Sequence, residues 1–314
     1  MRIVIVGAGG VGGLLAGLLS QAGEEVAVVA RGAHLAAIRE QGLRVEGDMG
    51  NFTARVEASD AIEALAPADA VFVATKAWQV ADVAPKLAHL VREGTVVLPL
   101  QNGVEAPLTL LGGLWPGPVL GGLCAVFSWI QAPGVIRMVG PAIWVKAGEW
   151  PRGRSARVEA LCEVLRRAGV DARPQEDVEA AAWEKFLFID PFGAAGALAA
   201  APMGAVRGTP ETRALLEQLV SEVGALARAR GVNLPAEAEA RTLAWFDRLA
   251  PDSTASMQRD LLAGRPSELL DQVGSVVRMA AETGVDAPAH RFALAALLPR
   301  EKAAREKAGL PAVG

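Results

Sequence analysis

The sequence predicts an α/β fold in which a doubly wound, mostly parallel sheet is followed by an all-α C-terminal domain. In the first half of the 314-residue chain, short apolar segments typical of buried strands alternate with segments typical of helices. From about Glu176 the pattern changes to long stretches of helical periodicity punctuated by glycine and proline. Because this length suits two hydrophobic cores, we expect two domains, residues 1–174 and residues 175–314.

The chain opens with a strand, a glycine-rich loop and a helix. Residues 3–6 read as a buried strand and residues 11–19 as an apolar helix. The loop that joins them has glycines in G-x-G-x-x-G register and consists of Gly7, Ala8, Gly9, Gly10, Val11 and Gly12. The first glycine of this motif permits a sharp turn, the second lets the backbone approach a pyrophosphate, and the third lets the helix pack on the strand. Free N–H groups at the helix start favour phosphate binding. The segment predicts a Rossmann-type domain that binds a dinucleotide.

The end of the second strand, residues 26–30, indicates which dinucleotide is bound. In a site that prefers NAD, the second strand usually ends in Asp or Glu, which binds the ribose hydroxyls. Here Ala30 and Arg31 occupy that place. No carboxylate repels a 2′-phosphate, and a guanidinium can pair with one in forked geometry. We therefore expect NADPH; the alternative is that Arg31 is only a solvated loop residue.

Further strands and helices alternate through the rest of the first domain. Strands are predicted over residues 43–45, 52–56, 70–75, 96–100, 119–130, 135–138, 143–147 and 170–174. Helices are predicted over residues 32–41, 80–90 and 157–168, with Gly169 as the C-cap of the last. Pro85 is expected to kink the middle helix or to mark its start. The polar segment near residues 171–177 marks the boundary of the domain.

The second domain is predicted to be helical. Its long helices are expected over residues 178–198, 211–230, 236–249 and 269–282. The charged tail from Glu301 is expected to end in a mobile stub. Ligands of such folds bind beyond the carboxyl ends of the strands, so the substrate is expected in the cleft between the domains. The helical domain is apolar enough to offer a homodimer interface.

Composition excludes several classes of function. The net charge of −4 gives no general attraction to nucleic acid or to anionic membranes. No run of about 20 apolar residues could span a membrane, and glycines interrupt the apolar opening segment, so we expect a cytoplasmic protein. Cys124 and Cys162 are expected to be buried thiols rather than a disulfide. His34, His89 and His290 show no metal-ligand spacing, and the absence of tyrosine excludes a tyrosine general acid.

Two polar residues follow predicted parallel strands directly. Lys76 follows residues 70–75, and Asn102 follows residues 96–100. The carboxyl ends of parallel strands face the crevice where a dinucleotide lies, so both side chains are candidates for cofactor or substrate contacts. The alternatives are an exposed loop lysine and an ordinary Asn-Gly turn.

Three candidates for the chemistry lie in the second domain. Lys185 stands on an otherwise apolar helix, where it either extends to solvent or, facing a cleft, donates a proton to a carbonyl oxygen. Glu268 is expected to begin a helix after a Gly-Arg-Pro turn, either as a carboxylate stabilised by the helix dipole or as a site residue. Ser256 is either a helix cap or a contact for a substrate carboxylate.

Taken together, these motifs resemble the ketopantoate reductase (2-dehydropantoate 2-reductase) family over nearly the whole chain. The matching segments are GAGGVG at 7–12, ARGAHL at 30–35, TKAWQ at 75–79, QNG at 101–103, APG at 132–134, WEK at 183–185 and SMQRD at 256–260. Glu268 follows the last of these after eight residues. Each motif is short, but their order and spacing are specific.

The resemblance implies a function and a role for each candidate. The reaction would be the NADPH-dependent reduction of 2-dehydropantoate to (R)-pantoate, a step of pantothenate and coenzyme A biosynthesis. Residues 7–12 would bind the pyrophosphate and Arg31 the 2′-phosphate. Lys185 would be the general acid, with Glu268 beside it and near the cofactor ribose. The remaining contacts would be Lys76 and Asn102 on the nicotinamide side, with Asn102 also touching substrate, and Ser256 on the substrate carboxylate.

The chain departs from the family pattern where substrate is held. The family commonly has asparagines four and eight residues after the lysine and a third in the following loop, where this chain has Ile189, Gly193 and, near the third, Met203. Asp190 is polar but lies about 140° round an ideal helix from the required face. A more apolar pocket suits a branched or aromatic 2-oxo acid, which would make the chain a D-2-hydroxyacid dehydrogenase.

Two further alternatives remain. A non-catalytic regulatory protein that binds NADPH would not need the substrate asparagines, but it would not need Lys185 or Glu268 either. An opine- or imine-type reductase would use the same cofactor domain and would require an amine together with the keto acid.

Overall fold

The computed structural model describes residues 1–114 and 117–312, and these form two compact units. Unit 1 comprises Met1–Gln101 and Ala106–Glu179, and unit 2 comprises Asn102–Glu105 and Ala180–Gly314. The division after Glu179 lies five residues beyond the boundary expected from the sequence. The short segment Asn102–Glu105 also belongs to unit 2, although it lies within the first half of the chain.

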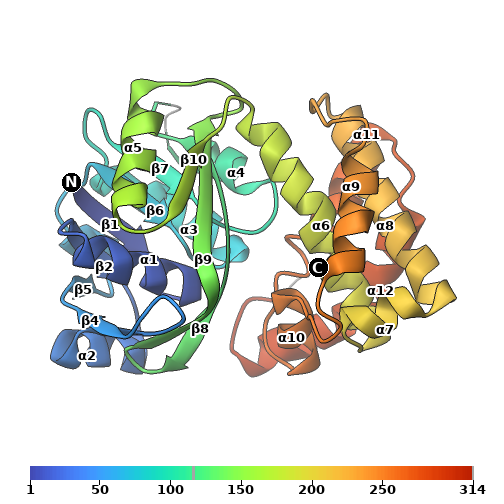
Figure 1. Ribbon diagram of the computed structural model, residues 1–314, viewed down its shortest axis with the longest axis horizontal. Helices are drawn as coiled ribbons and strands as arrows, with labels where there is room; N and C mark the ends of the chain where they lie inside the picture. Colours follow the sequence, from blue (N-terminus) through green and yellow to red (C-terminus); the bar gives the residue numbers. More distant parts are fainter. Residues whose placement is uncertain (115–116, 313–314) are drawn as a thin grey trace. The chain divides into compact units, whose positions relative to one another are not determined.

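Unit 1 is built on a five-stranded parallel sheet, which confirms the predicted fold class (Figure 1). Its strands, in spatial order, are β5 (Glu57–Ser59), β2 (Glu25–Val29), β1 (Arg2–Val6), β6 (Ala70–Val73) and β7 (Val96–Pro99). Ile3 and Ile5 pack into one hydrophobic cluster, while Val4 and Val6 pack into another. Both faces of the sheet are therefore buried, which explains the continuous apolar runs of these strands.

Helical segments cover both faces of this sheet. The helices packed into the cluster of Ile3 and Ile5 are α1 (Gly10–Gln21) and α2 (Gly32–Gln41). The same cluster includes α5 (Ala156–Arg167), which packs against the second sheet described below. The segments on the side of Val4 and Val6 are η1 (Ile62–Ala64), α3 (Val80–Val83), η3 (Ala84–His89) and α4 (Ala106–Gly113), with η2 (Ala77–Gln79) leading into α3. The helix predicted over residues 80–90 is thus a short α-helix followed by a 3-10 helix. Pro85 stands in the first turn of η3, where its missing N–H is tolerated because the first N–H groups of a helix have no partner within it.

The remaining strands of unit 1 form a second sheet, which the sequence did not separate from the first. Its order is β10 (Asp171–Pro174), β9 (Val135–Glu149), β3 (Leu43–Gly47) and β4 (Phe52–Ala54), with β8 (Leu120–Ala132) paired antiparallel to β9. The strands expected at 135–138 and 143–147 are one continuous strand, β9. Strand patterns identify segments but not their partners, and the long β8–β9 hairpin recruits β3 and β10 by pairing with opposite parts of β9.

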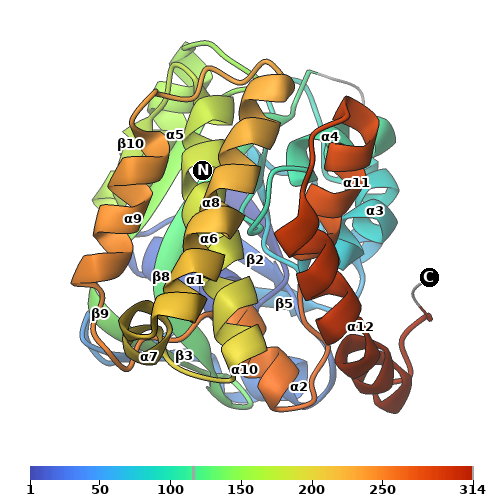
Figure 2. The same cartoon turned by 90° about the vertical axis from the view of Figure 1, so that its right-hand side faces the viewer.

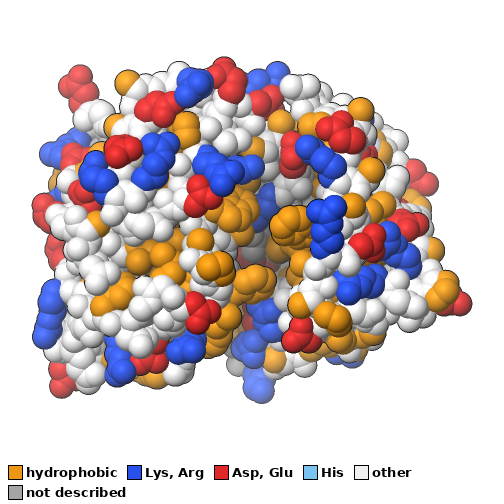
Figure 3. Space-filling model, in the orientation of Figure 1, with side chains coloured by type: hydrophobic (Ala, Val, Ile, Leu, Met, Phe, Trp, Pro, Cys, Tyr) orange, Lys and Arg blue, Asp and Glu red, His pale blue; other side chains and the backbone are white. Residues whose placement is uncertain are grey.

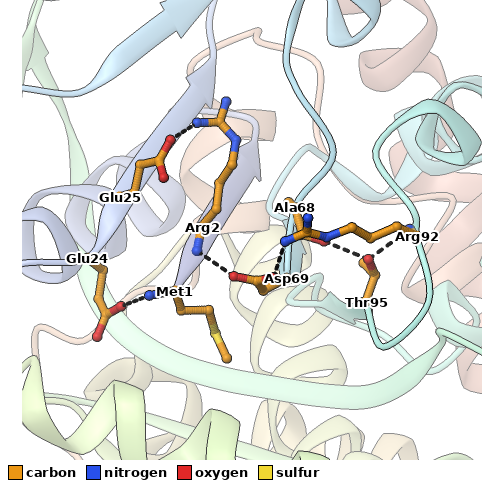
Figure 4. Close-up of polar contacts among 8 residues, drawn as sticks. All are labelled: Met1, Arg2, Glu24, Glu25, Ala68, Asp69, Arg92 and Thr95. Carbon is orange, nitrogen blue, oxygen red and sulfur yellow. Dashed lines mark hydrogen bonds and ion pairs between the residues drawn. The ribbon is translucent and has the colours of Figure 1, made fainter.

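Hydrogen bonds and ion pairs join the amino ends of the parallel strands, as Figure 4 shows. The N-terminal ammonium of Met1 lies 2.6 Å from Glu24 Oε2, and the Arg2 guanidinium pairs with Glu25. The backbone N–H of Arg2 donates to Asp69 Oδ2 at 2.8 Å. Asp69 also pairs with Arg92, whose backbone N–H donates to Thr95 Oγ1, and this hydroxyl donates to the Ala68 carbonyl. The network ties β1, β2 and β6 together at this end.

Unit 2 is helical. Its helices are α6 (Val178–Ala199, whose first two residues lie in unit 1), α7 (Met203–Gly208), α8 (Pro210–Ala229), α9 (Ala238–Arg248), α10 (Ser256–Leu262), α11 (Val273–Thr283) and α12 (Pro288–Lys307). Figure 2 shows α8 between α9 on one side and α11 and α12 on the other. Apolar side chains of all these helices fill one core, in which the rings of Phe188 and Phe246 stack with their centroids 4.9 Å apart.

The expectation that a helix begins near Glu268 is wrong. Residues 268–272 form turns and α11 begins only at Val273, because Gln272 has a non-helical backbone (φ −103°, ψ −90°). The charged tail from Glu301 continues α12 as far as Lys307, and the Glu301 side chain is fully buried. Residues 313–314, at the end of the stub that was expected to be mobile, lie outside the described residues. Glu301 accepts hydrogen bonds from the backbone N–H and the hydroxyl of Ser267, which gives this carboxylate a structural place in the core.

On the face of the molecule that Figure 3 shows, charged side chains of both signs are interspersed. Large exposed apolar side chains of the β8–β9 hairpin include Phe127, Trp129 and Val139. Cys124 and Cys162 are both buried with free thiols, as expected. Among residues 1–114 and 117–312, no helix is long and apolar enough to cross a membrane.

Candidate active site

The glycine loop of unit 1 has a backbone that requires glycine at Gly7 and Gly12. Gly7 has φ +106°, and a Cβ there would lie 2.8 Å from backbone atoms of Ala74 and Thr75. A Cβ on Gly12 would lie 2.0 Å from the Gly7 carbonyl oxygen. Gly9, the N-cap of α1, has no atom within 4 Å of its Cβ position. The loop therefore turns tightly, packs closely at Gly12 and leaves open space beside Gly9 and the helix N-terminus, as a pyrophosphate requires.

Buried polar atoms near the carboxyl ends of the strands lack partners. Among the described residues, no hydrogen bond reaches Thr75 Oγ1, Gln101 Oε1 or Ser128 Oγ. Gln101 is held in place because its Nε2 donates to the Val73 and Thr75 carbonyls at 2.9 and 3.1 Å. Ser128 lies against the start of α1, where a Cβ on Gly10 would come within 2.3 Å of its carbonyl oxygen. Buried polar groups are normally satisfied, so these atoms fit a polar ligand at this end of the sheet.

Two predicted cofactor contacts of unit 1 lie at the same end of the sheet. Arg31 follows β2 directly, is exposed, and is the N-cap of α2. Lys76 follows β6, and its ammonium lies 5.8 Å from the centre of the Trp78 ring. The backbone N–H of Lys76 donates to Gln79 Oε1 at 3.2 Å, which fixes the start of η2.

His34 supports the glycine loop, a role that the sequence did not reveal. Its Nε2 lies 2.9 Å from the Ala8 carbonyl oxygen, and its Nδ1 accepts the N–H of Gly134 at 3.0 Å. This pattern requires a neutral ring with its proton on Nε2, and burial lowers the pKa of His34 accordingly. The residue thus links α2, the loop and the β8–β9 turn. Its only signal in the sequence is its position within ARGAHL.

In unit 2, Lys185 and Asn102 meet directly. Lys185 Nζ donates a hydrogen bond to Asn102 Oδ1 at 2.8 Å. Both residues are half-buried, and Lys185 stands on α6 between the buried Trp183 and Phe186. The ammonium is therefore held at one point by an amide oxygen instead of extending freely into solvent, which is the arrangement a directed proton donor needs.

Glu268 lies in the turns that precede α11 and is 6% exposed. Gln272 Nε2 lies 3.5 Å from its Oε2. Its neighbour Ser267 is anchored to Glu301, as described above, and the Arg278 side chain donates to the Leu270 carbonyl while pairing with Glu105. Arg278 therefore links the Glu268 turn to the segment that carries Asn102.

Asp271 is a second carboxylate in this turn, which the sequence reasoning missed. Its Oδ2 has no hydrogen-bond partner among the described residues. Burial, followed by the nearby charge of Glu268, raises the pKa of Asp271 to about 6. The spacing of three residues from Glu268 was the available signal. A Cβ on Gly103 would lie 3.3 Å from the Asp271 carbonyl oxygen, so this turn packs beside the Asn102 segment.

The positions where the family commonly has asparagine are apolar and lie in different surroundings. Ile189 is half-buried one turn after Lys185 on α6, whereas a Cβ on Gly193 would meet the Met257 side chain at 2.6 Å. Met203 is 1% exposed at the start of α7. Ser256 is the first residue of α10 and is half-buried, directly before Met257.

Asp190 does not replace these asparagines. Its side chain is fully buried and its Oδ2 lies 2.7 Å from His290 Nε2. The sequence left open whether Pro191 distorts the helix enough to turn Asp190 towards the Lys185 face. The structure directs this carboxylate towards α12 instead.

Comparisons with known proteins identify the family. The family model described as ketopantoate reductase PanE/ApbA matches residues 3–152, and the model of its C-terminal domain matches residues 177–301. The chain belongs to the ketopantoate reductase family. Members of this family are oxidoreductases, and the resemblance drawn from the sequence motifs is therefore confirmed.

Individual relatives agree with the family assignment. The 2-dehydropantoate 2-reductase of Mesorhizobium japonicum is 33% identical over 88% of this chain and 90% of its own length. That of Pyrococcus horikoshii is 29% identical over 92% and 93%. The crystal structure of 2-dehydropantoate 2-reductase from Geobacter metallireducens superposes with a TM-score of 0.87; it is 31% identical and covers 96% of this chain and 99% of its own. The crystal structure of a ketopantoate reductase from Ralstonia eutropha superposes with a TM-score of 0.88; it is 29% identical and covers 96% of this chain and 98% of its own. D-mandelate dehydrogenase with NADH and anilino(oxo)acetate has the same fold (TM-score 0.87, 96% and 98% coverage) at 21% identity.

Proposed function

We propose that this member of the ketopantoate reductase family reduces 2-dehydropantoate to (R)-pantoate with NADPH, a step of pantothenate and coenzyme A biosynthesis. The observation that carries the proposal is the 2.8 Å hydrogen bond from Lys185 Nζ to Asn102 Oδ1, which holds a proton donor in a fixed place. Relatives that match over about nine-tenths of their length are 2-dehydropantoate 2-reductases, which supports the proposed substrate.

The residues of unit 1 suit the cofactor. The N–H groups at the start of α1, beside the open space at Gly9, would hold the pyrophosphate. Arg31 would pair with the 2′-phosphate, and no carboxylate stands at the end of β2 to repel it. Lys76 would contact the rest of the dinucleotide, together with the Thr75 and Gln101 side-chain oxygens, which have no hydrogen-bond partner among the described residues. When bound, NADPH supplies a hydride to the carbonyl carbon of the substrate.

The residues of unit 2 would donate the proton and hold the substrate. Lys185 donates a proton from Nζ to the 2-keto oxygen as negative charge develops there, so that the carbonyl becomes an alcohol and the amine is reprotonated from water. Asn102 orients the ammonium through its amide oxygen, and Glu268 holds the ammonium and tunes its basicity. Ser256 would bind the substrate carboxylate through its hydroxyl.

A second substrate class follows from the apolar residues beyond Lys185. Ile189 and the Gly193–Met257 contact offer no side-chain hydrogen bond to a substrate hydroxyl. A buried hydroxyl without a partner costs about 1–3 kcal/mol. These residues favour a branched or aromatic 2-oxo acid as the alternative substrate of the same reaction.

A substrate panel tests the proposal. Oxidation of NADPH is followed by absorbance with 2-dehydropantoate and with branched and aromatic 2-oxo acids, each with and without an added amine. We expect the highest kcat/KM with 2-dehydropantoate. Another 2-oxo acid that exceeds it by more than about tenfold, equivalent to about 1.4 kcal/mol, would replace it as the substrate. Turnover only with an amine would identify an imine-type reductase, and NADPH binding without any turnover would identify a regulatory protein.

The role of Lys185 is tested by substitution. Lys185→Ala should lower kcat by roughly 10²–10⁴-fold, because the proton donor is lost, while the Kd for NADPH stays the same. Lys302→Ala provides the matched control, since Lys302 is an exposed lysine of the same unit. Turnover of Lys185→Ala near that of the control would rule out Lys185 as the acid.

A further inference from the structure

Three ionisable side chains from three helices meet inside unit 2, away from the residues assigned to chemistry. His290 of α12 has Nε2 2.7 Å from Asp190 Oδ2 of α6 and Nδ1 2.6 Å from Glu222 Oε2 of α8. The exposed fractions are 0% for His290 and Asp190 and 6% for Glu222. We call these residues the Asp190–His290–Glu222 triad.

The triad contains a charged imidazolium. Both ring nitrogens face carboxylate oxygens, so both must donate a hydrogen bond. Burial opposes the charge, but the charges and hydrogen bonds of Asp190 and Glu222 outweigh it and raise the pKa of His290 to about 9. Glu222 also accepts the backbone N–H groups of Ala289 and His290 at the start of α12. Although burial opposes ionisation of Glu222 too, these hydrogen bonds lower its pKa.

The triad holds α6 where this helix is weakest. Pro191 follows Asp190 within α6 and has no N–H, so the Leu187 carbonyl receives no helix hydrogen bond from residue 191. A proline inside a helix usually kinks it. Lys185 stands five residues before Asp190, about 7.5 Å along the helix axis. The direction in which the Lys185 ammonium points therefore depends on how this part of α6 is fixed.

Stability alone does not account for three buried ionisable groups. Replacing a buried ion pair by apolar residues of similar volume is often neutral or even stabilising, so such groups are poor evidence of a stabilising role. One oxygen of the triad, Asp190 Oδ1, has no hydrogen-bond partner among the described residues. The hydrogen bonds that are made are directional, however, and they connect α6 to both α8 and α12.

We propose that the Asp190–His290–Glu222 triad is a positioning device that fixes α6 at Pro191 and so sets the place of the Lys185 ammonium against Asn102. The kinetic consequence rests on the proposed function of Lys185. The structural consequence, the hydrogen bond between Lys185 and Asn102, does not.

The test removes the Asp190–His290 ion pair while keeping hydrogen-bond donors for Glu222, the buried carboxylate that remains. In the double variant Asp190→Leu/His290→Leu, Glu222 keeps its two backbone N–H donors, and apolar groups fill the gap. Asp190→Asn is a milder second variant that keeps an acceptor for His290 Nε2. Thr242→Val is the matched control, because Thr242 is a buried polar residue of α9 in the same unit that belongs neither to the triad nor to the proposed machinery.

Two readouts separate positioning from a merely structural role. The first, from crystal structures of the variants, is the Lys185 Nζ–Asn102 Oδ1 distance, which should exceed hydrogen-bond range in the double variant and stay at 2.8 Å in the control. The second is kinetic. Since a misplacement of about 1 Å can cost on the order of 10²-fold, kcat should fall at least about tenfold and the primary isotope effect with deuterated NADPH should rise, while the Kd for NADPH stays unchanged.

A folded double variant that keeps both the hydrogen bond and wild-type kcat would overturn the proposal. If the double variant does not fold, the same two measurements on Asp190→Asn decide it, with a smaller expected fall in kcat. If the wild-type protein reduces no 2-oxo acid, the proposed function fails, but the distance measurement still tests the positioning role.

Discussion

The two ends of the parallel sheet in unit 1 are built from the same strands but differ in how their polar groups are bonded. At the amino end, Arg2, Asp69 and Arg92 are bound by neighbouring protein groups (Figure 4), although Arg2 Nε has no hydrogen-bond partner among the described residues. At the carboxyl end, the loop beside Gly9 is open and the buried Thr75 and Gln101 oxygens lack partners among the described residues. The amino end is organised for stability, and the carboxyl end leaves hydrogen-bonding capacity for a ligand.

Substitutions in the glycine loop should give the largest effects. One of them should lower the free energy of unfolding and another should weaken NADPH binding, so the two roles of the motif can be measured separately. Gly12→Ala should destabilise the fold by about 3 kcal/mol, because the new methyl group would lie 2.0 Å from the Gly7 carbonyl oxygen. Gly9→Ala should leave the free energy of unfolding nearly unchanged, because its Cβ meets nothing and its φ of −72° suits alanine. It should nevertheless raise the Kd for NADPH at least about tenfold by obstructing the approach of the phosphates. Denaturant unfolding and fluorescence titration measure the two effects. Wild-type affinity in Gly9→Ala would show that no phosphate approaches this loop.

The triad in unit 2 extends the comparison, because like the amino end of the sheet it consists of groups that bind one another. The pKa of His290 is raised to about 9 in the folded protein, against about 6.5 when unfolded. Its contribution to stability is therefore complete below pH 6.5 and is lost as the pH rises through about 9. The loss should be on the order of 2–3 kcal/mol. The free energy of unfolding, measured by denaturant between pH 6 and 10, should show this fall.

The control for this prediction is His290→Gln, which cannot titrate and should lack the pH-dependent fall. An equal fall in the variant would assign the effect to other groups, such as the thiols. A flat profile in the wild-type protein would show that His290 is neutral in the folded state, which would contradict the charge state assigned to the triad.

Substitution of Arg31 should show whether the carboxyl end of the sheet selects NADPH over NADH. Arg31→Ala removes the guanidinium that would pair with the 2′-phosphate, and hydrogen bonds between charged groups contribute about 1.5–3 kcal/mol. The Kd for NADPH should therefore rise roughly 10–100-fold while the Kd for NADH stays the same. Arg39→Ala is the matched control, because Arg39 is an exposed arginine of the same helix whose Nε donates to the Ala58 carbonyl. A wild-type preference for NADH would contradict the proposed cofactor.

Features encoded by neighbouring residues could be predicted from the sequence. The glycine loop is an example, because the turn at Gly7 and the close approach at Gly12 follow from their spacing within one strand and one helix. Most strands were located for the same reason, although β5 was not predicted. The division of the strands into two sheets was missed, since the pattern of one strand does not identify the strand with which it pairs. Pairing is decided by the β8–β9 hairpin and by how β3 and β10 reach β9.

Features made by residues far apart in sequence were not predictable. Asp190 and His290 are 100 residues apart, and each alone is an ordinary polar residue. Glu301 stands at the start of a charged tail in the sequence, yet its side chain binds Ser267, which lies 34 residues earlier. The contact between Lys185 and Asn102 joins the two halves of the chain. The family motifs singled out both residues, but only the fold brings an amide oxygen to the ammonium.

The smallest expected effect is at the amino end of the sheet, where substitutions should change stability but not binding. Asp69→Asn removes the charge that pairs with Arg92, and such partly exposed pairs contribute about 0.5–1 kcal/mol. The hydrogen bond from the Arg2 backbone, followed by that from Arg92, lowers the pKa of Asp69. The contribution of Asp69 to the free energy of unfolding is thus present above its unfolded pKa of about 3.9 and is lost as the pH falls through the lower folded value.

The free energies of unfolding at pH 7 and at pH 3 should therefore differ less for Asp69→Asn than for the wild type, and the Kd for NADPH should be identical in both proteins. A changed Kd would mean that the two ends of the sheet are coupled through β1 and β6, and the separation between a stabilising end and a binding end would then fail.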